Sequence, residues 1–111
     1  MGLTKTENFN AEQNELAKIA KALGHPARIA IIQHLLKVNS CIGGDIVDEI
    51  GLAQPTISKH LKELKAIGII KGTIEGTSVN YCIDATRWRE VQSVLNQLFN
   101  TYELDQQDCD C

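Results

Sequence analysis

Apolar residues recur at helical spacing in three long stretches of the chain. The first stretch covers residues 11–23, the second runs from Pro26 to about Val38, and the last runs from about Ala85 to Tyr102. Gly24 and the residue after it interrupt the first two stretches, and a proline is well tolerated in the first turn of a helix. The pattern predicts a mainly α-helical protein.

A further pair of helices is predicted in the middle of the chain. Residues 46–71 show a short helix, a turn at Gly51 and a second helix that begins near Pro55. Three apolar residues of the second helix share one face at 100° per residue and should face a core. They are Ile57, Leu61 and Leu64. This arrangement is a helix-turn-helix, whose second helix is suited to the DNA major groove.

The opposite face of this second helix carries small and polar residues at its start and lysines further along. Such a face suits contacts with base edges in the first turns and with phosphates beyond them. The predicted DNA-contacting residues are Gln54, Thr56, Ser58 and Lys59, with Lys62 on phosphate. An ordinary surface helix with solvated lysines is the alternative, but the preceding turn and the following strands favour DNA binding.

Two β-branched runs follow the second helix. They are Ile69–Ile74 and Ser78–Ile83, and residues 75–77 form a short hairpin signal between them. Alternation places Val79, Tyr81 and Ile83 on one face. The predicted fold is therefore a winged helix-turn-helix, mainly α with a small β-hairpin (α+β).

The last predicted helix repeats apolar residues at spacings of three and four. The seam consists of Trp88, Val91, Leu95, Leu98 and Tyr102. Such a seam suits packing against another helix, and one short recognition helix rarely supplies enough affinity for DNA. We therefore expect a homodimer that uses this helix. The alternative is that the helix folds back onto its own domain.

Length and charge fit one small DNA-binding domain. We divide the 111 residues into a flexible segment 1–10, a winged helix domain 11–102 and an acidic, cysteine-containing tail 103–111. The net charge is −3, and a few lysines on an acidic body predict strong salt sensitivity. Four lysines lie in the predicted helix-turn-helix and the strand after it, residues 46–71, which we call the reading unit. They are Lys59, Lys62, Lys65 and Lys71.

The length of the apolar runs indicates in which cellular compartment the protein should be found. None of them is long enough to cross a membrane, and residues 1–10 are polar and lack the apolar core of a signal peptide. We therefore expect a cytoplasmic protein without a membrane partner. In that compartment the four cysteines should be thiols or metal ligands instead of structural disulfides.

Two separated motifs resemble those of a known family. Residues 22–28 read ALGHPAR and resemble the opening motif of the ArsR/SmtB family of bacterial repressors, and residues 54–61, QPTISKHL, are similar to its recognition-helix signature. The resemblance covers residues 12–102. It implies a homodimeric repressor that binds double-stranded operator DNA without a cofactor and releases it when a metal, metalloid or oxidant acts. In members of this family the tip of the wing often carries basic residues. Here residues 74–77 read IEGT, so the resemblance does not extend to wing contacts with the phosphate backbone.

The cysteines are the candidate inducer site. Cys41 matches the first cysteine of the ELCVCDLC motif of arsenite- and cadmium-responsive members, but Gly43 and Ile46 stand where the other two belong. The tail adds Cys109 and Cys111. Three thiolates suit arsenite, and cadmium or lead could use the same sulfurs with a tail carboxylate. The predicted metal site is therefore Cys41, Cys109 and Cys111, with arsenite or another thiophilic ion as inducer.

Other interpretations of the cysteines remain open. Cys41 could simply pack as a small apolar residue, and Cys82 on the wing strand is expected to be structural. The resemblance also allows a redox or sulfide sensor, since some relatives bridge a cysteine near the Cys41 position to one in the last helix; here the second cysteine would come from the tail. The zinc site that other relatives carry on the last helix is not expected, because residues 85–102 contain no histidine.

The sequence also bears on functions of a different class. An enzyme is not expected, because the sequence shows no nucleophile–base pair, no glycine-rich phosphate loop and no Cys-X-X-Cys motif. A winged helix that binds proteins instead of DNA remains an alternative, favoured by the acidic composition and the poorly charged wing.

Overall fold

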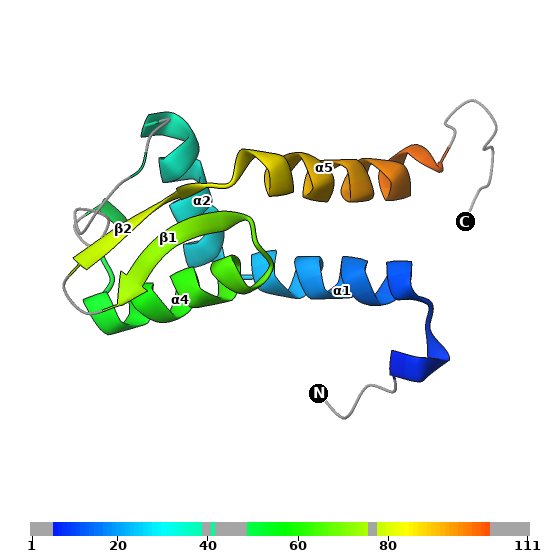
Figure 1. Cartoon of the computed structure of the whole chain (residues 1–111), viewed down its shortest axis with the longest axis horizontal. Helices are drawn as coiled ribbons and strands as arrows, with labels where there is room; N and C mark the ends of the chain where they lie inside the picture. Colours follow the sequence, from blue (N-terminus) through cyan, green and yellow to red (C-terminus); the bar gives the residue numbers. More distant parts are fainter. Residues whose placement is uncertain (1–5, 39–40, 42–48, 76–77, 103–111) are drawn as a thin grey trace, which may run out of the picture.

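The computed structural model describes residues 6–38, 41, 49–75 and 78–102 of the chain. Its elements are a 3-10 turn at Thr6–Asn8, α1 (Ala11–Leu23), α2 (Pro26–Val38), α4 (Gln54–Ala66), β1 (Ile70–Glu75), β2 (Ser78–Ile83) and α5 (Ala85–Asn100) (Figure 1). The predicted winged helix fold, mainly α with a β-hairpin, is confirmed; residues 46–48, where the first helix of the predicted helix-turn-helix begins, lie outside the described residues. The predicted tail 103–111 and residues 1–5 of the predicted N-terminal segment lie outside the described residues.

Side-chain caps fix where two of the helices begin. Asn10 accepts a hydrogen bond from the backbone N–H of Gln13 at 2.7 Å, and the Gln13 side chain accepts one from the Asn10 N–H at 3.0 Å. This reciprocal capping box satisfies two backbone donors that a helix start leaves unpaired. Asp84 caps α5 in a similar way by accepting from the Arg87 N–H at 3.1 Å. Both starts agree with the sequence prediction.

The core lies where α2, α4 and the hairpin meet. The predicted stripe of α4 is confirmed, because Ile57, Leu61 and Leu64 are fully buried. Helix α2 contributes Ile31, Ile32 and Leu35 to this core, whereas its Ile29 and Leu36 are 41% and 49% exposed.

The hairpin forms an antiparallel pair in which Ile70 lies opposite Ile83 and Glu75 opposite Ser78. Tyr81 is fully buried, as its predicted alternation required. Gly72 has a φ of 127°, and a Cβ atom there would lie 2.1 Å from the backbone oxygen of Asn80. Glycine is therefore required where the two strands approach this closely. The tip, residues 76–77, lies outside the described residues.

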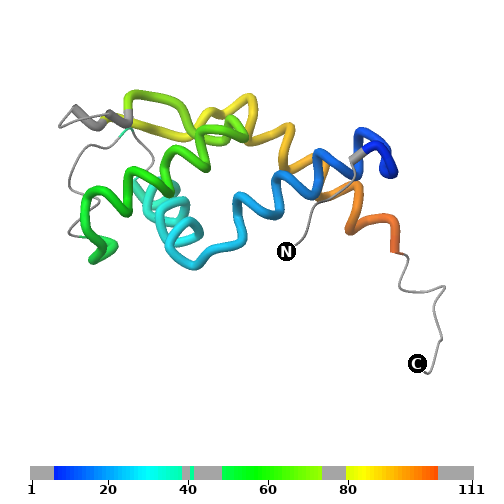
Figure 2. The backbone as a smooth tube through the Cα atoms, turned by 90° about the horizontal axis from the view of Figure 1, so that it is seen from below, coloured from blue at the N-terminus to red at the C-terminus, as the bar shows by residue number. Residues whose placement is uncertain are grey.

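Helices α1 and α5 lie side by side and extend away from the winged helix body (Figures 1 and 2). The predicted seam on α5 is only partly buried. Val91 is buried, whereas Leu98 and Tyr102 are 52% and 55% exposed, and Phe99, beside the seam, is 68% exposed. The second half of α5 thus offers an apolar surface. No helix in the described part of the chain is long and apolar enough to span a membrane.

Candidate nucleic-acid interface and cysteine pair

The outward face of α4 is accessible, as the sequence predicted. Thr56, Lys59 and Lys62 are exposed, and Gln54 and Ser58 are partly exposed. The Gln54 amide donates a hydrogen bond to the Ser58 hydroxyl at 3.1 Å. Both side chains are therefore oriented at the start of the helix, where base edges are usually contacted. The turn ahead of α4 uses Gly51 with a φ of 82°.

One lysine of the predicted basic cluster, the exposed Lys65, makes an intramolecular hydrogen bond. The Lys65 Nζ donates to the backbone oxygen of Gly72 at 2.7 Å. This bond joins the end of α4 to β1, so the recognition helix and the first strand of the wing are held together. Lys65 therefore contributes to the geometry of the reading unit in addition to its charge.

The inward side of α4 is held by a histidine. His60 is 8% exposed, and its Nδ1 accepts a hydrogen bond from Arg28 Nε at 3.0 Å. The His25 ring lies 4.4 Å from the His60 ring, centroid to centroid. Burial lowers the pKa of His60, and the charges of His25, Arg28 and Lys59 lower it further. His60 thus braces the recognition helix as a neutral side chain.

Arg87 of α5 connects α1, α5 and the turn that follows α4. It donates from Nε to the backbone oxygen of Ile67 at 2.8 Å, from Nη2 to Glu15 of α1 and from Nη1 to Glu90 of α5 at 3.2 Å. The hydrogen bond to Glu15 is the main cause of a raised pKa of Arg87, so the guanidinium is firmly charged. The long helices are therefore tied to the turn that follows α4.

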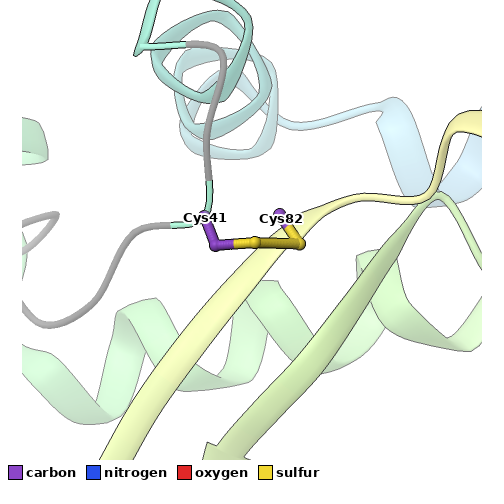
Figure 3. The surroundings of a disulfide bond; sticks show 2 residues. All are labelled: Cys41 and Cys82. Carbon is purple, nitrogen blue, oxygen red and sulfur yellow. A yellow bond between two sulfur atoms is a disulfide. The ribbon is translucent and has the colours of Figure 1, made fainter.

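The structure joins Cys41 to Cys82 in a disulfide (Figure 3). The two Cα atoms are 4.2 Å apart, although the residues are 41 positions apart in the sequence. Cys41 is exposed and lies beyond the end of α2, whereas Cys82 is partly buried in β2. The bond thus connects the segment that leads into the helix-turn-helix with a strand of the wing.

Thiols or metal ligands were expected in place of structural disulfides, with a redox bridge from Cys41 to the tail as the alternative. The structure instead pairs Cys41 with Cys82, which was expected to be structural. One signal was present: strand alternation placed Cys82 on the face opposite the buried Tyr81, and therefore away from the core. Cys109 and Cys111 lie outside the described residues, so the predicted set of Cys41, Cys109 and Cys111 stays a prediction.

A cavity of about 270 Å³ adjoins the cysteine pair. Its lining consists of Leu35, Leu36, Cys41, Cys82, Ile83, Ala85, Trp88 and Arg89. Apolar residues thus form most of the wall, and Arg89 lines the same cavity as the two cysteines. Within the described ranges, no three histidine, cysteine or acidic residues gather as a metal site would require.

Comparisons with known proteins agree with this geometry. Residues 25–71 match the family described as "Bacterial regulatory protein, arsR family". The chain is 40% identical over 82 residues to an HTH-type transcriptional regulator of Methanocaldococcus jannaschii, covering 74% of this chain and 92% of that protein. It is 39% identical over 64 residues to the HTH-type transcriptional repressor SmtB of Mycobacterium tuberculosis, covering 58% of this chain and 47% of SmtB.

A solved structure gives the same assignment. The transcriptional repressor BigR of Xylella fastidiosa superimposes with a TM-score of 0.58 and 25% identity, over 95% of this chain and all of that one (100%). These relatives are transcriptional regulators, which confirms that the chain is not an enzyme. The helix-turn-helix, the β-hairpin after it and these matches together show that the chain belongs to the ArsR/SmtB family of winged helix transcriptional repressors.

Proposed function

We propose that this repressor is a cytoplasmic homodimer that binds double-stranded operator DNA through α4 and is released by oxidation of Cys41 and Cys82 to a disulfide. The contacts would come from Gln54, Thr56, Ser58 and Lys59, with Lys62 on phosphate. The observation that supports the release step is the pairing of Cys41 with Cys82.

The position of the pair gives oxidation a way to act on DNA binding. Cys41 leads into the helix-turn-helix, and Cys82 lies on β2, directly opposite Lys71 of β1. A bond between them constrains the entry to the helix-turn-helix relative to the wing. The reduced protein can adjust this relationship when α4 enters the groove, whereas the bridged protein cannot. Oxidation therefore favours one of two arrangements of the reading unit, which is the requirement for a switch.

The expected compartment supports a regulatory bond over a permanent one. Cytoplasmic thiols are kept reduced by the glutathione and thioredoxin systems, so a disulfide there is usually transient. Cys41 is exposed and can react with solutes, and Cys82 is close enough to resolve the oxidised sulfur. Such a pair would report an oxidising condition and then be reset.

A thiophilic ion is the second candidate inducer. Members of the family respond to metal ions. In the reduced protein Cys41 and Cys82 would present two neighbouring thiolates, and arsenite takes three. The tail cysteines, Cys109 and Cys111, could supply the third ligand, either with this pair or in the set predicted from the sequence.

The exposed half of α5 supports dimerisation. Leu98 and Phe99 are more than half exposed, and Phe9, just ahead of α1, is 49% exposed. A second copy that covers these side chains would remove this apolar area from water. It would also bring two α4 helices to one operator, which raises both affinity and specificity.

Fluorescence anisotropy of the protein on its own promoter DNA separates these inputs. We expect tight binding by reduced protein and release by diamide, with release lost in Cys82→Ser and kept in Cys109→Ser/Cys111→Ser. Release by arsenite that is lost only in the tail variant would instead support the metalloid site. Failure to bind at low salt would contradict the repressor function itself.

A further inference from the structure

The cavity beside the cysteine pair has the composition of a small-molecule site. We propose that it binds a small organic hydroperoxide with an apolar body, and that this compound is the oxidant of Cys41. The inference rests on the proposed redox function and adds the chemical class of its inducer. It starts from the lining, in which two cysteines and one arginine accompany aliphatic and aromatic residues.

The volume limits the size of the ligand. The cavity holds about 270 Å³. An apolar protein cavity of about 150 Å³ accepts benzene, whereas drug-sized ligands need about 300–1,000 Å³. The site therefore suits a single ring or a short branched chain with a few further atoms. A phospholipid hydroperoxide would be too large to enter.

The apolar wall selects against hydrogen peroxide. Leu35, Ile83 and Trp88 can bury the hydrocarbon part of an organic peroxide, and burial of apolar surface supplies binding free energy. Hydrogen peroxide has no such part and gains nothing from these side chains. The wall thus concentrates organic hydroperoxides beside the sulfur atoms and leaves hydrogen peroxide at its solution concentration.

Arg89 supplies the polar end of the site. Arg89 lines the same cavity as the two cysteines. A guanidinium that comes near a thiol favours the thiolate, which is the reactive form. The same group can donate hydrogen bonds to a peroxide oxygen on which negative charge develops. The combination of thiolate, cation and apolar wall is what reduction of an alkyl hydroperoxide needs.

The reaction balances with the two cysteines alone as reductants. The Cys41 thiolate attacks the terminal peroxide oxygen, the O–O bond breaks, and the leaving alkoxide takes a proton to become the alcohol. Cys41 is then a sulfenic acid. The Cys82 thiol attacks that sulfur, the S–S bond forms, and the hydroxyl group leaves with the thiol proton as water. Two thiols and one hydroperoxide thus give a disulfide, an alcohol and water.

The direct test is the oxidation rate of reduced full-length protein with cumene hydroperoxide and with hydrogen peroxide. Unreacted thiols are alkylated at set times, and the Cys41 and Cys82 peptides are quantified by mass spectrometry. We expect cumene hydroperoxide to close the pair at least about tenfold faster at equal concentration, because its ring is buried in the cavity. Equal rates, or faster reaction with hydrogen peroxide, would overturn the proposal.

A variant that fills the cavity sharpens the test. Ala85, the first residue of α5, lines the cavity. Its neighbour Thr86 is also exposed but is not among the lining residues. Ala85→Leu should remove most of the preference for cumene hydroperoxide and change the hydrogen peroxide rate by less than about twofold, since only the burial of the ring is lost. Thr86→Leu should keep the preference. A preference that survives in Ala85→Leu, or an equal slowing with both peroxides, would contradict a binding role for the cavity.

The two proposals fail in different ways. If diamide releases the operator but cumene hydroperoxide shows no advantage, the redox switch stands and the cavity proposal is wrong. If cumene hydroperoxide closes the pair selectively but operator affinity does not change, the cavity proposal stands and the switch is wrong.

Discussion

Arg28 donates a hydrogen bond from Nε to Nδ1 of His60 across 3.0 Å, and so joins the start of α2 to the inner side of the recognition helix. The same guanidinium donates from Nη1 to the backbone oxygen of Ala22 near the end of α1, at 3.1 Å. One side chain therefore positions α4 against two helices. Both motifs that resembled the family contribute to this contact, since residues 22–28 contain Arg28 and residues 54–61 contain His60.

Removal of this contact should affect both stability and DNA binding. We expect Arg28→Met to lower the free energy of unfolding by about 1–3 kcal/mol, because Nδ1 of buried His60 is left without its donor. Operator affinity should also fall, because α4 is less firmly positioned. Urea denaturation and anisotropy measure the two effects. Lys37→Met, an exposed change on the same helix, is the matched control and should alter neither.

His60 should make stability depend on pH in the mildly acidic range. Its pKa is lowered from 6.5 by burial and by the positive groups around it, His25, Arg28 and Lys59, which Glu63 only partly opposes. Just below pH 6.5 the unfolded chain therefore binds a proton at this position that the folded chain does not. The free energy of unfolding must then fall as the pH drops from 6.5 toward the lowered pKa of the folded protein.

Replacement of this histidine should reduce that dependence. Urea titrations at about pH 7.5 and about pH 5.5 should show a smaller loss of stability in His60→Asn than in the parent protein. Asparagine keeps a hydrogen-bond acceptor for Arg28 but does not titrate. An equal loss in both proteins would mean that another group sets the acid sensitivity.

Lys62 is expected to contact phosphate without reading sequence. Lys62→Ala should weaken binding to specific and nonspecific DNA alike and lower the slope of log K against log salt by about 0.9 per DNA-bound lysine. Anisotropy over a salt series gives this slope. Thr56→Ala on the same exposed face serves as comparison, since loss of a base contact should weaken the operator more than random DNA. A Lys62→Ala protein with an unchanged slope would exclude the phosphate contact.

The apolar end of α5 should hold the dimer together. Phe99 is 68% exposed in the single chain, and Phe99→Glu would place a charge in the proposed interface. We expect a monomer in sedimentation velocity and a large loss of operator affinity. Ser93→Glu, also on α5 and exposed, adds the same charge outside the apolar patch and should leave a dimer. A dimeric Phe99→Glu protein would place the interface elsewhere.

Most of the fold could be predicted because the elements are local and their signals agree. The apolar periodicity of α4 and the alternation of β2 both follow from a single buried face, and Pro26 and Pro55 mark helix starts. Periodicity does not show which sides of a helix have neighbours, and Ile29 and Leu36 of α2 are apolar yet exposed.

The cysteine pair could not be predicted because it depends on tertiary structure. Cys41 and Cys82 are 41 residues apart, and no local spacing links a segment after α2 to the second strand of a hairpin. A resemblance to metal-sensing relatives directed attention to the tail instead. The contact between Arg28 and His60 likewise joins two motifs that lie 32 residues apart, so no local pattern predicts it.

Release of DNA by the Cys41–Cys82 disulfide can be tested by mapping the disulfides of DNA-bound and unbound protein from one partly oxidised sample. The two fractions are separated on immobilised operator DNA, alkylated and digested without reduction, and the peptides are identified by mass spectrometry. The redox switch predicts that Cys41 is linked to Cys82 in the unbound fraction and that both cysteines are alkylated thiols in the bound fraction. Equal amounts of this link in both fractions, or a link from Cys41 to Cys109 or Cys111 in the unbound one, would contradict it.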